Sequence, residues 1–256
     1  MRETKVIRLK HDIEINDPIL MVGLPGVGHV GKLVAEHIIE EMDGEKIIEI
    51  YSPHFPPQVL VDEENVIRLV RNEIHACKLN GTDALILVGD HQSSSSEGHY
   101  ELCDIYLDLA QEYGVKKVIT LGGFPTGQLT HEDEVMGAVN NPELKEQLEE
   151  AGVVFKENEP GGGIVGASGL LLGLSGFREL DAACLMGLTS GYLVDPKSAQ
   201  SLLKVLGNIF DVEIDVGPLE ERAKEMEKIV ARLMEKEQQQ VLQEVSSSDE
   251  DLRYIG

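Results

Sequence analysis

The chain has 256 residues, with 22 Lys and Arg against 46 Asp and Glu, so its formal net charge is −24 at neutral pH. This length suits one large domain or one domain with an appendage, and a hydrophobic content of 42% is enough to build a substantial core. The charge, together with the lack of any Lys/Arg cluster in the sequence, argues against nucleic acid or an anionic membrane as the main partner, because phosphates would be repelled.

The sequence contains no signal for a membrane span, a secretory leader or a metal centre. No apolar run reaches the roughly 18 residues that a membrane span needs, and residues 1–10 are charged. Cys77, Cys103 and Cys184 are scattered and odd in number, and no pair of histidines has metal-ligand spacing with a third ligand nearby. We therefore expect a cytoplasmic protein without a metal.

The first half of the chain predicts strands that alternate with helices. A helix from Val27 to Met42 follows from its apolar spacing, and Asp43-Gly44 ends it. Two short polar strands are expected after the segment Ser52–Pro57. The other expected elements are strands within 4–24, a strand over 46–51, the two polar strands over 59–61 and 66–74, a buried strand over 84–89 and a helix over 100–113.

The second half continues the alternation. A strand over 115–121 is expected to end at Gly122-Gly123. It is followed by a strand over 135–139, helices over 142–151 and 165–174, a buried strand over 182–188 and a helix over 197–210. Alternating strands and helices predict an α/β fold with a sheet between two layers of helices, and the paired strands after residue 57 indicate a mixed sheet.

The composition changes at Gly217-Pro218, which divides the chain into three expected parts. Residues 1–216 form the α/β domain, 217–245 a long helix and 246–256 a flexible tail. The helix has a heptad seam, expected to pack on the body or on a sister subunit, formed by Leu219, Ala223, Met226, Val230 and Leu233. The polar tail ends in an apolar and aromatic tip, Leu252-Arg253-Tyr254-Ile255-Gly256.

The loop between the strand at 19–22 and the following helix allows three interpretations. Gly26, Gly28 and Gly31 match a dinucleotide fingerprint, with Glu49 as the ribose-binding acid. The same loop matches a phosphate-binding loop ending in Lys32, except that Leu33 replaces the hydroxyl residue that binds Mg²⁺. In the third interpretation, the glycines make a tight turn and let the helix pack closely on the sheet.

Two further parts of the sequence could form sites. Asp90-His91-Gln92-Ser93 follows a buried strand and could contribute to an acid–His–Ser arrangement, or it could be a polar loop that caps the next helix. The glycine segments 122–127 and 161–166 could line one crevice together with the loop at 26–31, but the sequence supplies no evident acid, base or nucleophile for it.

Several of these segments, in the same order, resemble the archaeal proteasome assembly chaperone family. The resemblance covers roughly residues 5–210 and rests on Leu24–Gly31, Leu87–Asp90, Leu121–Gly123 and Gly161–Gly166 with Leu170-Leu171. It implies an α/β sandwich similar in layout to nucleoside phosphorylases, homo-oligomers or pairing with a paralogous chaperone, and no catalytic activity or cofactor.

The resemblance also concerns the tail. Related proteasome-binding proteins end in a hydrophobic residue, Tyr and one further residue, and insert this tail between α-ring subunits of the 20S particle. Here Leu252, Tyr254, Ile255 and Gly256 are the partner-binding residues that it implies. Arg253 precedes Tyr254 and two residues follow it, so the terminal carboxylate is displaced by one residue. We expect a non-enzymatic adaptor; the alternative is a nucleotide- or nucleoside-binding enzyme that uses the loops 26–31 and 161–166.

Overall fold

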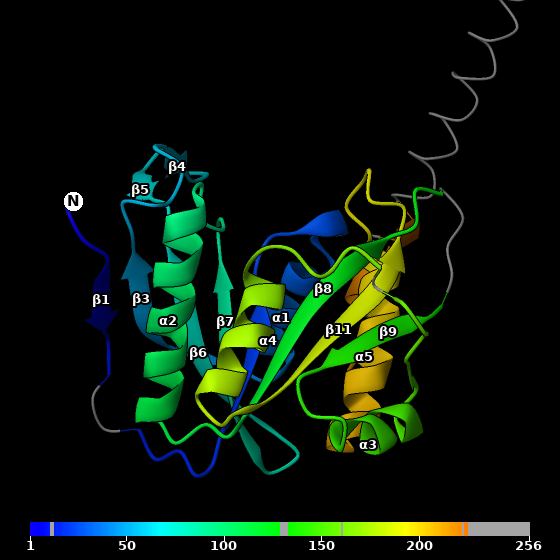
Figure 1. The fold of residues 1–256 in the computed structure, drawn as a ribbon. Helices are drawn as coiled ribbons and strands as arrows, with labels where there is room; N and C mark the ends of the chain where they lie inside the picture. The colour runs from blue at the N-terminus through cyan, green and yellow to red at the C-terminus, as the bar shows by residue number, and fades with distance from the viewer. Residues whose placement is uncertain (11–12, 129–132, 160, 222, 225–256) are drawn as a thin grey trace, which may run out of the picture.

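The computed structural model describes residues 1–10, 13–128, 133–159, 161–221 and 223–224. They form one large mixed sheet with helices on both faces, and a separate small hairpin (Figure 1). The strands are β1 (Lys5–Arg8), β2 (Ile19–Gly23), β3 (Glu45–Tyr51), β4 (Val59–Val61), β5 (Ile67–Leu69), β6 (Asn72–Leu79), β7 (Thr82–Gly89), β8 (Lys117–Pro125), β9 (Val135–Val139), β10 (Val153–Val154) and β11 (Asp181–Thr189). The helices are η1 (Val27–His29), α1 (Val30–Glu41), α2 (Ser96–Glu112), α3 (Leu144–Glu150), α4 (Ala167–Phe177) and α5 (Pro196–Phe210).

The large sheet has nine strands in the order β1-β3-β6-β7-β2-β8-β11-β9-β10. Its centre, β7-β2-β8-β11, is parallel, and these strands are almost entirely apolar, as strands buried on both faces must be. Antiparallel pairs flank this centre, formed by β1, β3 and β6 on one side and by β9 on the other. The predicted mixed α/β sheet is therefore confirmed.

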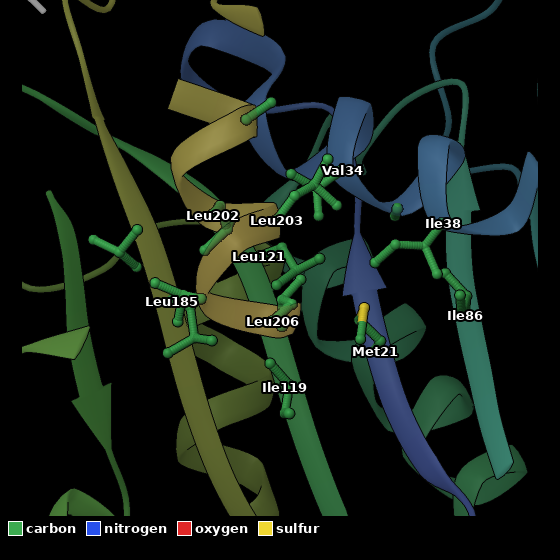
Figure 2. Close-up of a cluster of buried hydrophobic side chains, with 14 of the residues drawn as sticks. Met21, Val34, Ile38, Ile86, Ile119, Leu121, Leu185, Leu202, Leu203 and Leu206 are labelled. Atoms are coloured by element: carbon green, nitrogen blue, oxygen red, sulfur yellow. The ribbon is translucent and has the colours of Figure 1, made fainter. Parts of the chain in front are cut away.

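Helices cover the two faces of the sheet in pairs. In Figure 1, α2 and α4 lie in front of the sheet, and α1 and α5 lie behind it. Figure 2 shows Val34 and Ile38 of α1 and Leu202, Leu203 and Leu206 of α5 directed at the central strands. The front core is separate and contains the buried side chains of α2, such as the fully buried Tyr106.

The strand predictions needed three corrections. The pair β4–β5 forms a sheet of its own, so the mixed character of the main sheet does not come from these strands. The expected strand over 66–74 is two strands, because the chain leaves the hairpin at Val70-Arg71 before β6 begins. Residues 13–15 form no strand, although β1 and β2 on either side of them do.

The end of one strand and the start of one helix also differ from expectation. β8 continues through Gly122-Gly123 to Pro125, paired with β11 along its whole length. α2 begins at Ser96, where the side chain of Ser95 accepts a hydrogen bond from the Gly98 amide and so caps the helix.

The C-terminal helix is described only at its start. Residues 217–221 and 223–224 are helical, and the rest of the predicted helix and tail, 225–256, lies outside the described residues. Leu219 is 1% exposed and belongs to the core cluster of α1 and α5, and Ala223 is buried as well. Nearby, the His37 ring on α1 hydrogen-bonds the Asp215 carbonyl at 2.5 Å. The helix therefore starts as part of the packed body.

Candidate functional site

A cavity of about 510 Å³ lies toward the edge of the sheet at which the four parallel strands end, and it is lined by the loops after β2 and β7, by residues of β8 and β11, and by the segment that leads into α4. All three glycine segments contribute to its lining, through Gly26 and Gly31, Gly122 and Gly123, and Gly161 to Gly163 with Gly166. The prediction that these segments share one crevice is confirmed. From β2 the chain passes through α1 to β3, toward one end of the strand order, and from β8 it passes to β9, toward the other end. The cavity therefore lies beside the point where the strand order reverses, which is a common ligand position in α/β sheets.

The glycines after β2 are explained by close packing. A Cβ added to Gly31 would lie 2.1 Å from the Leu121 carbonyl oxygen, so only glycine lets α1 approach β8 this closely. Gly28 has φ of +62°, and its carbonyl accepts a hydrogen bond of 2.8 Å from the Asp195 amide. His29 is exposed at the start of α1. The geometry favours the interpretation in which these glycines make a turn and a tight helix–sheet contact.

The two nucleotide interpretations of this loop find no matching geometry. Glu49 lies on β3, and β6 and β7 separate that strand from β2, whereas the ribose-binding acid of a dinucleotide fold lies on the adjacent strand. The Lys32 ammonium donates to the Gly89 carbonyl at 3.0 Å and pairs with Glu36 at 3.4 Å. The Lys32 side chain is thus engaged in contacts within the protein, and Glu49 is paired with Lys46.

The side chains of Asp90, His91 and Ser93 do not form an acid–His–Ser arrangement. Asp90 accepts two hydrogen bonds from Arg68, at 2.6 and 2.9 Å, and one from the Arg71 amide. Burial alone would raise the pKa of Asp90. The hydrogen bonds from Arg68 and the Arg71 amide, together with the charge of Arg68, outweigh this effect, so the carboxyl pKa lies below its usual value. The His91 ring contacts Gln58, and the Ser93 hydroxyl donates to the Ser95 carbonyl. This segment is the polar loop before a helix that the alternative interpretation expected.

Gln92 connects the loops around the cavity, a role that the sequence did not reveal. Its side-chain amide donates to the Pro25 carbonyl at 2.7 Å, and its oxygen accepts from the Ala167 amide at 2.9 Å. The His99 ring lies 3.3 Å from the same oxygen. One side chain therefore ties the loop after β2 to the first residue of α4. The signal available in the sequence was its position, three residues after the end of the buried parallel strand β7.

A charged network lies on the sheet away from the cavity, on β3 and β6. Lys46 pairs with Glu49 at 2.8 Å and Glu73 at 3.2 Å, and Arg71 pairs with Glu73 at 2.6 Å. Burial alone would raise the pKa of Glu73, but hydrogen bonds from His75 and Arg71 and the charge of Arg71 lower it to about 2. Glu49, the proposed ribose acid, is thus part of a structural ion-pair network.

Within the described ranges, no group of three or more His, Cys, Asp or Glu side chains is arranged to hold a metal ion. No described helix is long and apolar enough to cross a membrane. Several predicted site residues lie outside the described residues, namely Met226, Val230, Leu233, Leu252, Tyr254, Ile255 and Gly256.

The arrangement of sheet, loops and helices can be compared with known proteins. The family model described as "PAC2 family" matches residues 20–234. The chain belongs to the PAC2 family. The match spans the central strands, the cavity loops and the start of the C-terminal helix, and it agrees with the resemblance to archaeal proteasome assembly chaperones noted from the sequence.

Three relatives show how far the likeness of this PAC2 protein extends. It is 39% identical over 254 residues to the uncharacterized protein MJ1210 of Methanocaldococcus jannaschii, covering 98% of this chain and 97% of that one. It is 39% identical to Pyrococcus furiosus PbaB, an archaeal proteasome activator whose crystal structure superposes with a TM-score of 0.86, covering 91% of this chain and all (100%) of that chain. Pyrococcus furiosus PbaA, an archaeal homolog of proteasome-assembly chaperone, has 25% identity and a TM-score of 0.75 over 93% of this chain and 94% of that chain.

Proposed function

We propose that this PAC2 protein is a non-enzymatic proteasome-binding adaptor that docks its C-terminal residues on the α-ring of the 20S particle. The observation that carries the proposal is the likeness to PbaB, an archaeal proteasome activator, at 39% identity and a TM-score of 0.86. The second support is the terminal sequence, in which Tyr254 stands between Leu252 and Ile255 close to the end of the chain. We further propose that several chains act together as an oligomer, because linked binding segments raise the effective concentration of one another.

The main experiment is co-sedimentation of the protein with archaeal 20S particles. Deletion of residues 252–256 is expected to abolish co-sedimentation, and Tyr254→Ala is expected to weaken it by about tenfold or more, since an aromatic anchor commonly dominates such contacts. Tyr192→Ala is the matched control, because Tyr192 is a tyrosine that is 71% exposed in the body. Co-sedimentation that survives the deletion contradicts tail docking. Native mass spectrometry must show the same subunit number before and after the deletion.

A second variant addresses the displaced carboxylate. Deleting Gly256 leaves one residue after Tyr254 and so restores the spacing of the related tails. If the terminal carboxylate pairs with a lysine of the α-ring pocket, this variant binds more tightly and stimulates peptide hydrolysis by the 20S particle more strongly than the full chain. Weaker binding after this deletion would show that Gly256 itself belongs to the docking segment and that the carboxylate register is different.

A further inference from the structure

The proposed tail docking makes no use of the cavity at the carboxyl edge of the sheet. Its volume of about 510 Å³ is within the range of about 300–1,000 Å³ that is usual for small-molecule sites. One wall is the sheet, which contributes Gly122, Cys184 and Met186, and the other is the loop 161–166 that leads into α4. Gln92 binds the amide of Ala167, directly after this loop, and the Pro25 carbonyl after β2. One end of the loop is therefore held to the neighbouring wall of the cavity by hydrogen bonds.

The charges around the cavity select against anions. None of the described lining residues is Lys, Arg or His, and the single charged side chain among them is that of Glu159. Burial raises the pKa of the Cys184 thiol to about 11, so this side chain is neutral at physiological pH. The chain as a whole carries a net charge of −24. A phosphate or carboxylate would find no countercharge here and would be repelled.

The walls are apolar side chains and bare backbone. Leu24, Phe124, Ile164 and Met186 supply the apolar surface, and the glycines leave peptide planes open to the cavity. The side-chain amide of Gln92 is already engaged on both of its ends. Ser168 also lines the cavity, and its hydroxyl has no hydrogen-bond partner among the described residues. Such a lining fits a ligand with a flat apolar body and one hydrogen-bonding group.

We propose that this cavity binds a neutral, mainly apolar small molecule about the size of two aromatic rings, with the Ser168 hydroxyl as its polar contact. Binding adds a ligand site to the adaptor and requires neither catalysis nor the proteasome. It can therefore be measured on the protein alone, so its failure and the failure of tail docking are separate results.

Gly122 offers a way to close the cavity without disturbing the fold. It lies on extended strand β8, and a Cβ placed there would find its nearest neighbour, Met186, at 3.9 Å. The side chain of Gly122→Leu therefore extends into the cavity. Gly173→Leu on α4 is the matched control, because a Cβ at Gly173 meets nothing within 4 Å and Gly173 does not line the cavity. Ser168→Leu fills the cavity from the opposite wall and serves if Gly122→Leu lowers the melting temperature.

The experiment is a fluorescence titration of the full chain with two dyes that share one aromatic body. N-phenyl-1-naphthylamine is neutral, and 1-anilinonaphthalene-8-sulfonate carries a sulfonate in addition. We expect saturable binding of the neutral dye at one site per chain, and affinity at least about tenfold lower for the sulfonate. Gly122→Leu is expected to weaken binding of the neutral dye by at least about tenfold, and Gly173→Leu to leave it unchanged.

Any of four results would overturn the proposal. Absence of saturable binding of the neutral dye removes the site. Equal affinity for both dyes, or unchanged binding in both Gly122→Leu and Ser168→Leu, shows that the dye binds elsewhere, such as on the exposed apolar strands of the β4–β5 hairpin. If a folded Gly122→Leu protein no longer co-sediments with 20S particles, the cavity is part of a protein–protein interface and not a small-molecule site.

Discussion

Single glycines determine how closely the helices and strands of this protein approach one another. A Cβ on Gly23 would lie 2.3 Å from both the Ala35 side chain and the Gly31 carbonyl, and one on Gly123 would lie 2.4 Å from the Val27 carbonyl. These contacts involve backbone or short side chains that cannot move aside. Of the glycines that resemble a nucleotide-binding motif, Gly31 is required by packing in the same way and Gly28 by its positive φ, whereas a Cβ on Gly26 would meet only ordinary contacts.

Gly31→Ala tests this requirement. Its Cβ would lie 2.1 Å from the Leu121 carbonyl oxygen, so α1 must move away from β8. We expect the free energy of unfolding, measured by denaturant titration, to fall by about 3 kcal/mol or more. Gly173→Ala, at a helical position with nothing within 4 Å, should instead raise stability by about 0.5–1 kcal/mol. Equal effects of the two substitutions would contradict the packing role of Gly31.

The low pKa of Glu73 predicts a specific loss of stability in acid. The folded protein holds this pKa at about 2, below the ordinary value of 4.5 that we expect in the unfolded chain. The stabilisation is therefore complete above about pH 4.5 and is lost as the pH falls toward 2. We expect Glu73→Gln to lower the free energy of unfolding at pH 7 by about 1–2 kcal/mol, a value reduced for solvent screening.

The measurement is a series of denaturant titrations between pH 7 and pH 2. Glu73→Gln should flatten the pH dependence below pH 4.5, because its neutral side chain does not titrate. Glu149→Gln is the control, since Glu149 is an exposed residue of α3, and its effect should stay within about 0.5 kcal/mol. If the free energy of unfolding of Glu73→Gln falls below pH 4.5 as steeply as that of the unmodified protein, other carboxyl groups cause the pH dependence.

Among the elements, the start of the C-terminal helix has the clearest structural consequence. Leu219 is fully enclosed by the core cluster of α1 and α5, so the helix is packed on the body from its first turn. We expect Leu219→Ala to lower the free energy of unfolding by about 2–4 kcal/mol, because it removes buried methyl groups and leaves a cavity. Phe177→Ala, at a residue 89% exposed on α4, should change it by less than about 0.5 kcal/mol. Unfolding curves that coincide for Leu219→Ala and the unmodified protein would contradict this packing.

The sequence predicted most of the elements because their apolar periodicity is strong. The buried strands β2, β7 and β11 and the helices α1 and α5 were all anticipated close to their observed bounds. The end of β8 was misplaced because glycine disfavours strands, whereas Gly122 and Gly123 remain in the ladder opposite Met186 and Gly187. The two-residue strand β10 is too short to produce a pattern.

The candidate site was only partly predictable for a related reason. Glycine segments could be recognised in the sequence, and the position of the loop 26–31 beside Gly122-Gly123 follows from the neighbouring parallel strands β2 and β8, whereas 161–166 reaches the same place only after the antiparallel β9 and the short β10. The connection made by Gln92 depends on the relative placement of loops that are 67 and 75 residues away in sequence, which no local pattern encodes. The same applies to the distance of Glu49 from the glycine loop, because strand order is a property of the whole sheet.

On the scale of the whole molecule, the proposed docking depends on several tails acting together. A synthetic peptide of residues 246–256 should therefore compete for the 20S particle about 100-fold or more less effectively than the intact protein. Competition binding with labelled full-length protein measures this ratio. A peptide as effective as the protein would show that a single tail suffices and that the oligomer adds nothing to affinity.

The burial of Leu219 links two properties of the molecule, its stability and the point from which the C-terminal residues extend. Leu219 and Ala223 are buried, and Leu219 shares a core cluster with α1 and α5, so the fold of the body determines where the C-terminal helix starts. A change in the body that shifts α1 or α5 therefore also shifts the origin of the proposed docking segment.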